Sequence, residues 1–92
     1  MAEIEIDGTE TETGWVFQVT VSNGTSTVHK VNLTRDYYNH LSLPNLKPEK
    51  LVESSFIFLL EREPKEMILR NFDLKIISNY FSEYENSLSE YI

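Results

Sequence analysis

The stretch Trp15-Val16-Phe17-Gln18-Val19-Thr20-Val21 decides how this chain begins to fold. It is rich in β-branched and aromatic residues, which are enriched in β-strands. Its large apolar side chains recur at every second position, at Trp15, Phe17, Val19 and Val21. Because successive side chains of a strand point to opposite faces, this spacing predicts a strand with one buried face.

The residues that follow predict a turn and a returning strand. Ser22-Asn23-Gly24 has turn chemistry, and residues 27–33 again favour a strand. A two-residue loop of Asn23 and Gly24 would pair Val19 with Val28. That register puts Leu33 on the face opposite the apolar side of the first strand, which would leave it uncovered.

A longer loop resolves this conflict. A three-residue loop that ends with Gly24 in the left-handed conformation pairs Phe17 with His29 and Trp15 with Val31. The apolar residues of both strands, Val28 excepted, then share one face. We therefore expect the three-residue loop.

The N-terminal residues predict a further strand. Glu3-Ile4-Glu5-Ile6-Asp7 alternates with a period of two, which indicates a short edge strand with Ile4 and Ile6 directed inward. Gly8 interrupts the pattern, and the polar stretch 9–13 is typical of a loop, part of which could belong to a strand. The first third of the chain thus predicts a β-hairpin or a three-stranded antiparallel meander.

Helical signals begin at Thr34. Its hydroxyl suits a helix N-cap before a short helix over 35–41. After a connection over 42–46, Pro48 suits the first position of a main helix over 48–63. One apolar stripe at helical spacing marks that main helix: Leu51, Val52, Ser55, Phe56, Leu59 and Leu60.

Pro64 is expected to end the main helix. We predict a short helix over 65–71, with Met67, Ile68 and Phe72 directed inward, and a last helix over 74–84. The fold class is therefore α+β, with three or four helices packed on one face of the N-terminal sheet. We expect a single domain over 1–85 and a frayed acidic tail over 86–92.

Composition narrows the class of protein. Ninety-two residues make one domain, and apolar residues at 40% are too many for a disordered chain. The absence of cysteine excludes disulfides, thiolate metal sites and thiol nucleophiles. The first residues lack a signal-peptide pattern, and the longest apolar run, 56–60, is far short of a membrane span. We expect a cytoplasmic protein with no contact to the membrane.

The negative charge lies at the two ends of the chain. Of the net −7, residues 1–12 carry five carboxylates without a basic residue, and residues 83–92 carry three. Residues 13–82 are nearly neutral. Acidic ends repel phosphate backbones, which argues against a nucleic acid as the partner.

Three stretches in the second half carry a family resemblance. They are Phe58-Leu59-Leu60-Glu61-Arg62-Glu63-Pro64-Lys65-Glu66, Ile68-Leu69-Arg70-Asn71-Phe72-Asp73-Leu74 and Tyr80-Phe81-Ser82-Glu83-Tyr84-Glu85. With Thr34, Tyr37 and Tyr38, they resemble a group of small prokaryotic proteins of unassigned activity, over about residues 28–85. The resemblance implies a bacterial or archaeal origin, and it implies no function and no functional residue.

The sequence gives little support for a catalytic site or a metal site. His29 and His40 are the only histidines, and a metal site needs three or four converging ligands. A small enzyme would have to gather His40, Glu61 and Glu63 in one pocket. The three glycines are too far apart to form a phosphate-binding loop. We expect no catalytic residue, no metal and no cofactor.

Two functions of a binding protein remain. A helix pair over 65–84 could contact nucleic acid, but Lys65, Arg70 and Lys75 are its only basic residues. The alternative is a protein-interaction module, in its simplest form a homodimer, because aromatic residues are enriched where protein surfaces meet. The surplus of large aromatic rings favours this second function and gives six candidate interface residues: Trp15, Phe17, Phe56, Phe58, Tyr80 and Phe81.

Overall fold

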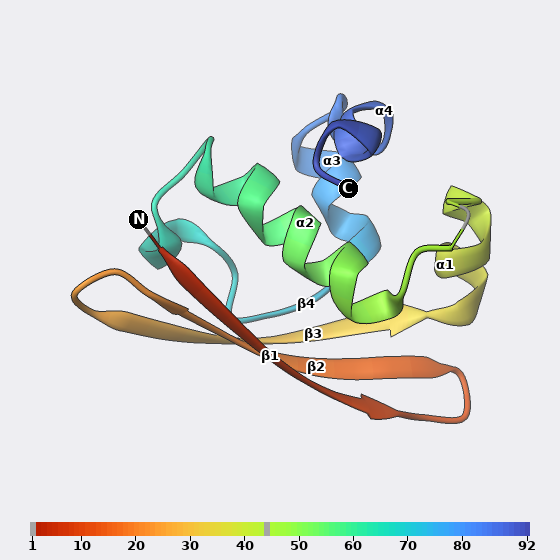
Figure 1. Ribbon diagram of the computed structural model, residues 1–92, viewed down its shortest axis with the longest axis horizontal. Helices are drawn as coiled ribbons and strands as arrows, with labels where there is room; N and C mark the ends of the chain where they lie inside the picture. The colour runs from red at the N-terminus through yellow and green to blue at the C-terminus, as the bar shows by residue number, and fades with distance from the viewer. Residues whose placement is uncertain (1, 44) are drawn as a thin grey trace.

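A computed structural model describes residues 2–43 and 45–92, and it confirms the α+β class. Three antiparallel strands form a meander, a short fourth strand extends it, and the helices cover one face of the sheet (Figure 1). No helix of the described residues lies on the opposite face of the sheet. The strands and helices are β1 (Glu3–Glu10), β2 (Gly14–Ser22), β3 (Ser26–Thr34), α1 (Arg35–Leu41), α2 (Pro48–Leu60), β4 (Asn71–Asp73), α3 (Ile77–Tyr80) and α4 (Tyr84–Ser87).

The hairpin of β2 and β3 has a three-residue loop, as predicted, but one residue further along. Ser22 pairs with Ser26, so the loop is Asn23–Thr25, and Gly24 adopts φ +96° within it. Phe17 consequently pairs with Val31 and not with His29. Because the loop moves by one residue, each residue of β2 pairs with a residue of β3 two positions beyond the predicted one. A change of two keeps the apolar residues on the predicted face.

Strand β1 is longer than predicted. It pairs with β2 without interruption from Glu3 to Glu10, so residues 9 and 10 belong to the strand and not to a loop. Gly8 pairs with Phe17, and a Cβ at Gly8 would lie only 2.6 Å from the Phe17 ring. Gly8 therefore continues the strand because its missing side chain leaves room for that ring.

Helices α1 and α2 begin where the sequence predicts. The Thr34 hydroxyl accepts a hydrogen bond from the Tyr37 amide at 3.1 Å, which caps α1. Pro48 occupies the first turn of α2. The helix ends at Leu60, three residues earlier than predicted, and residues 61–63 form a turn. Pro64 disfavours the helical conformation for Glu63, the residue before it. Pro44, in the predicted connection 42–46, lies outside the described residues.

The predicted helix over 65–71 is wrong. Residues 65–67 form a single 3-10 turn, and β4 then runs parallel to β3, with Phe72 opposite Val31. The Lys30 amide donates to the carbonyl of Arg70 at 2.7 Å. Ile68 and Phe72 point inward as expected, whereas Met67 is exposed.

The last predicted helix, over 74–84, is also broken. A 3-10 turn over residues 74–76 leads into α3, Phe81 is extended, and α4 starts at Tyr84. The segment after residue 85, predicted to fray, is helical and packed, because Leu88 is fully buried. Its Tyr91 carbonyl accepts a hydrogen bond from the Ser54 hydroxyl at 3.1 Å.

One core joins the inner face of the sheet to α2 and to the C-terminal segment. Its largest fully buried side chains come from all three parts: Phe17, Leu33, Leu51, Phe56, Phe58, Leu74, Tyr84 and Leu88. Within the described ranges, each helix falls short of the length and apolar character needed to cross a membrane.

Candidate functional site

Three of the six candidate interface residues lie in the core. Phe17, Phe56 and Phe58 have no exposed surface. Phe17 belongs to the inner face of β2, and the two others to the buried side of α2. These three rings therefore stabilise the core of a single chain and contribute no surface for a partner.

Phe58 shows how the aromatic surplus is used. The rings of Phe81, Tyr84 and Tyr91 meet its ring edge to face, with centroids 5.3–5.8 Å away. The guanidinium of Arg62 lies 3.6 Å from the ring centroid. These contacts fasten the C-terminal segment onto α2, since aromatic pairs and cation–π contacts add to the area that each ring buries.

Trp15 is half-buried at the other end of the molecule. Its ring meets Tyr38 of α1 edge to face at 5.2 Å, and the guanidinium of Arg35 lies 5.1 Å from its centroid. The structure thus places Trp15 in a contact between β2 and α1. It does not bring Trp15 together with Tyr80 and Phe81.

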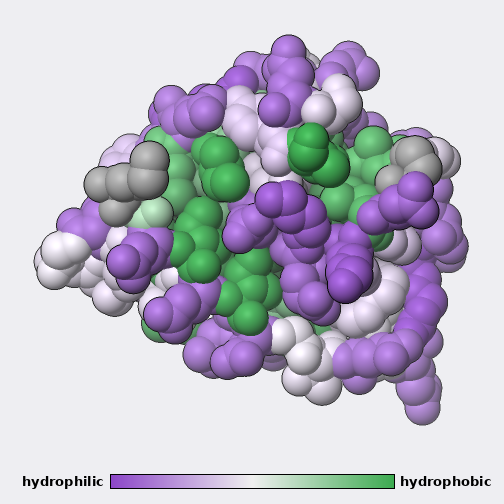
Figure 2. Space-filling model, viewed as in Figure 1, coloured by the Kyte–Doolittle hydropathy of each residue, from purple (hydrophilic) through white to green (hydrophobic). Residues whose placement is uncertain are grey.

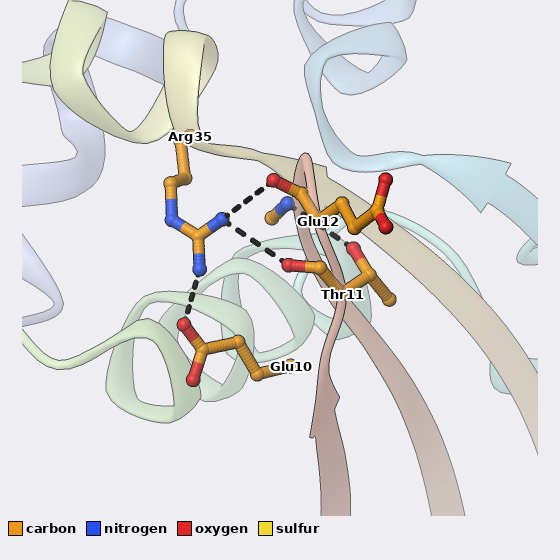
Figure 3. A network of polar contacts seen from close by, with 5 residues as sticks. Glu10, Thr11, Glu12 and Arg35 are labelled. Carbon is orange, nitrogen blue, oxygen red and sulfur yellow. Dashed lines mark hydrogen bonds and ion pairs between the residues drawn. The ribbon is translucent and has the colours of Figure 1, made fainter.

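Arg35 also holds the turn between β1 and β2 (Figure 3). Its Nη1 donates to the carbonyl oxygens of Thr11 at 3.2 Å and Glu12 at 3.1 Å, and its Nη2 contacts the Glu10 carboxylate. Both terminal nitrogens of the guanidinium thus hold this turn, which gives the network a structural role.

The remaining two candidates, Tyr80 and Phe81, line an open apolar groove of about 260 Å³. The groove lies between the end of α2, the segment that leads into β4, and α3. Four buried apolar residues contribute to its lining: Leu59, Ile68, Phe72 and Ile77.

The rim of the groove carries the most exposed large apolar side chains of the region. Met67 is 67% exposed, Leu69 46% and Tyr80 65%. The sequence prediction missed Leu69 and wrongly placed Met67 inward, because it treated 65–71 as a helix. The signal was present in the apolar run Met67-Ile68-Leu69. The 3-10 turn ends at Ile68, which is buried, whereas its two neighbours are exposed.

Glu63 gives the groove its charge. Its half-buried carboxylate lines the groove, and burial raises its pKa above the ordinary value. Within residues 2–43 and 45–92, no cation forms an ion pair with it. A basic group entering the groove would therefore meet an anion that is partly desolvated and has no competing partner.

His29 is fully buried near the groove, and both of its ring nitrogens have a hydrogen-bond partner. Its Nδ1 lies 2.8 Å from the Leu69 carbonyl, its Nε2 lies 2.8 Å from the Thr27 hydroxyl, and its ring packs edge to face on Phe56. Because both ring nitrogens are used, His29 fastens Leu69 to β3 and is not available as a ligand or a base.

The residues considered for catalysis are dispersed. His40 pairs with Glu85 at 3.6 Å, and Glu61 accepts a hydrogen bond from the Tyr91 hydroxyl at 2.6 Å. Glu63 alone of the three lines the groove. Among the described residues no group of three His, Asp or Glu side chains could hold a metal ion.

The helix pair required by the nucleic-acid hypothesis does not form, since residues 65–84 contain β4 and only short helical turns. Lys65 is buried, and its Nζ donates to Asn23 at 2.5 Å and to Glu66 at 2.7 Å. One of the three basic residues of that hypothesis is therefore committed to an internal contact.

Comparison with known proteins gives no relative for this chain: no family model, no curated protein and no solved structure matches it. The resemblance to small prokaryotic proteins stays a prediction, and function must be argued from the geometry of the groove.

Proposed function

We propose that this chain is a non-enzymatic protein-interaction module, and that the groove bordered by Met67, Leu69 and Tyr80 receives apolar side chains of another protein. The observation that carries the proposal is the clustering of these three exposed side chains around one open apolar groove. Single exposed apolar side chains need no explanation, but a cluster of them around a groove is typical of a surface that binds a partner.

The size and chemistry of the groove favour a protein segment over a small molecule. At about 260 Å³ it is smaller than the roughly 300–1,000 Å³ of small-molecule sites. It is lined by flexible and aromatic side chains. Methionine adapts to different apolar partners, and tyrosine supplies rigid contact area that often dominates binding energy.

The charge of the groove selects the kind of segment. Glu63 presents an anion without an ion-pair partner among the described residues, and the whole chain carries −7. A segment with one or two large apolar residues next to a lysine or arginine would complement both features. Electrostatic complementarity of this kind fixes which partner binds and in which register.

A second copy of the chain is the main competitor for this groove. It would bring another net charge of −7 to the contact, which disfavours self-association. Light scattering across a dilution series distinguishes the two. We expect a monomer at all concentrations; a stable dimer that Leu69→Glu dissociates would make the second copy the occupant and would contradict the basic partner.

Peptides selected on the immobilised protein from a random library test the proposal itself. We expect selected sequences with apolar residues next to Lys or Arg, and an affinity at least about tenfold weaker for Tyr80→Ala and Leu69→Ala. Val28→Ala is the matched control, since Val28 is 48% exposed but does not line the groove. Equal losses in all three variants would refute the groove.

Glu63→Gln tests the choice of partner. This change should weaken binding of a selected arginine peptide but leave binding of its norleucine analogue unchanged, because only the charge pair is removed. If both peptides lose affinity equally, Glu63 shapes the groove without recognising charge.

A further inference from the structure

Strand β1 offers a second binding surface, at its unpaired edge. It pairs with β2 along one edge and ends the sheet on that side, while β4 ends it on the other. Within the part of the chain that the structure describes, no strand pairs with the second edge of β1. The free N–H and C=O groups of such an edge can bond to an added strand.

Structural devices that usually block an edge are missing from β1. The strand runs for eight residues, its pairing with β2 is continuous from Glu3 to Glu10, and it contains no proline. No described helix or loop pairs with its outer edge. Charge is the one protective feature, since Glu3, Glu5 and Asp7 are all exposed.

The two faces of β1 differ sharply in chemistry. Ile4 and Ile6 are half-buried on the inner face, under the beginning of α2, and Glu3, Glu5 and Asp7 form an acidic row on the outer face. Any strand added to this edge would continue both rows, because paired residues of neighbouring strands point to the same face.

The inner row borders a shallow open groove. Ile4 and Ile6 form its apolar side, and Lys47, Lys50 and Glu53 are among the residues of α2 and its approach that form the other. Hydrophobic residues lie over β1 and α2 between hydrophilic ones on the face shown in Figure 2. Apolar side chains of an added strand would cover these isoleucines further.

We propose that the free edge of β1 receives a strand of a partner protein in which Lys or Arg alternates with an apolar residue. The basic side chains pair with Glu3, Glu5 and Asp7, and the apolar ones pack beside Ile4 and Ile6. Main-chain hydrogen bonds along the edge supply affinity, and the alternation supplies specificity.

The same chemistry argues against a second copy as the added strand. In an antiparallel pairing of β1 with itself, one register places the carboxylates of Glu3, Glu5 and Asp7 beside those of the other copy. A register shifted by one residue places them beside Ile4 and Ile6. The first arrangement repels and the second buries unpaired carboxylates, so both are disfavoured.

This surface is independent of the groove under Proposed function. That groove contains Phe72 of β4, at the opposite edge of the sheet. One surface can therefore fail a test while the other passes.

Labelled synthetic peptides test the proposal by fluorescence anisotropy. One eight-residue peptide alternates Lys with Val, and its control has the same composition with all lysines at one end. We expect the alternating peptide to bind at least about tenfold more tightly than the control. When it is added to the labelled protein, the changes in the protein's amide NMR signals should concentrate in β1, residues 3–10. Equal affinity of the two peptides, or shifts centred elsewhere, would overturn the proposal in favour of non-specific charge attraction.

A charge-reversal variant gives the matched test on the protein side. Glu5→Lys should weaken binding of the Lys/Val peptide about fivefold or more. Glu90→Lys, an exposed site outside the sheet, changes the net charge equally and should have little effect. If both variants weaken binding to the same extent, net charge and not the β1 edge holds the peptide, and the proposal fails.

Discussion

His29 joins two parts of the chain that lie forty residues apart. The Leu69 carbonyl can only accept, so Nδ1 carries the proton and Nε2 accepts from the Thr27 hydroxyl. Burial lowers the pKa of His29, and the charge of Arg70 lowers it further, while the bond to Leu69 opposes both. The folded protein therefore favours the neutral imidazole.

The lowered pKa of His29 makes the stability of the fold depend on pH. Its pKa is lower in the folded state than the 6.5 of an exposed histidine, so the unfolded chain binds the proton more readily. The stabilisation is complete above pH 6.5 and is lost as the pH falls toward the folded pKa. Urea unfolding between pH 7 and 5 should show a falling free energy, with a slope of at most about 1.4 kcal/mol per pH unit for one proton.

Two variants separate His29 from other groups. His29→Gln should lower stability at pH 7 and flatten the slope, because glutamine does not bind the proton. His40→Gln is the control that removes the other histidine and keeps His29. Glu63 acts in the opposite direction, since its raised pKa weakens stability as the pH rises. A slope unchanged in His29→Gln would show that His29 is not its source.

Phe58 and Tyr80 give a direct contrast between core and surface. Phe58 is fully buried among three aromatic rings, so Phe58→Ala should destabilise the chain by about 3–5 kcal/mol. Tyr80 is 65% exposed, and Tyr80→Ala should change stability by about 0.5 kcal/mol or less. Chemical denaturation of both variants measures this. Similar losses would show that Tyr80 supports the fold and cannot serve as a neutral probe of the groove.

At the scale of elements, the C-terminal segment completes the core. Leu88 is fully buried and Tyr91 packs on Phe58, although the local sequence is polar. Leu88→Ala should therefore cost about 2–5 kcal/mol in the free energy of unfolding. Ile92→Ala, at a half-exposed site, is the control and should cost about 0.5 kcal/mol or less. A negligible loss for Leu88→Ala would support the frayed tail that the sequence predicts.

The sequence predicts elements well where the signal is local. The period of two in 15–21, the cap at Thr34 and Pro48 at a helix start each act within a few residues, and the structure confirms all three. Strand β4 could not be found this way. It exists because Phe72 fits beside Val31 in a parallel pairing, and such long-range contacts leave little trace in a short window.

The candidate site was predicted only in part, for a related reason. The aromatic content indicates more rings than a small core needs. Which of these rings are buried depends on how the C-terminal segment packs. That packing places Phe58 inside and leaves Tyr80 outside. The rim positions of Met67 and Leu69 follow from a 3-10 turn over residues 65–67 and from β4 starting at Asn71, neither of which the sequence predicts.

At the scale of the whole molecule, one layer of helices covers one face of the sheet, and the two sheet edges differ (Figure 1). An apolar groove with a single carboxylate lies at the β4 edge, and an acidic strand forms the β1 edge. Both surfaces suit basic and apolar segments of other proteins. The proposal that this chain is a binding module rests on these two surfaces.

The most direct test of this account is the NMR amide spectrum of the labelled protein, titrated with a peptide selected on it. Binding in the groove predicts shifts concentrated between residues 59 and 81, around Met67, Leu69 and Tyr80, and their loss in Tyr80→Ala. Shifts concentrated outside residues 59–81, or shifts that persist unchanged in Tyr80→Ala, would contradict binding in the groove.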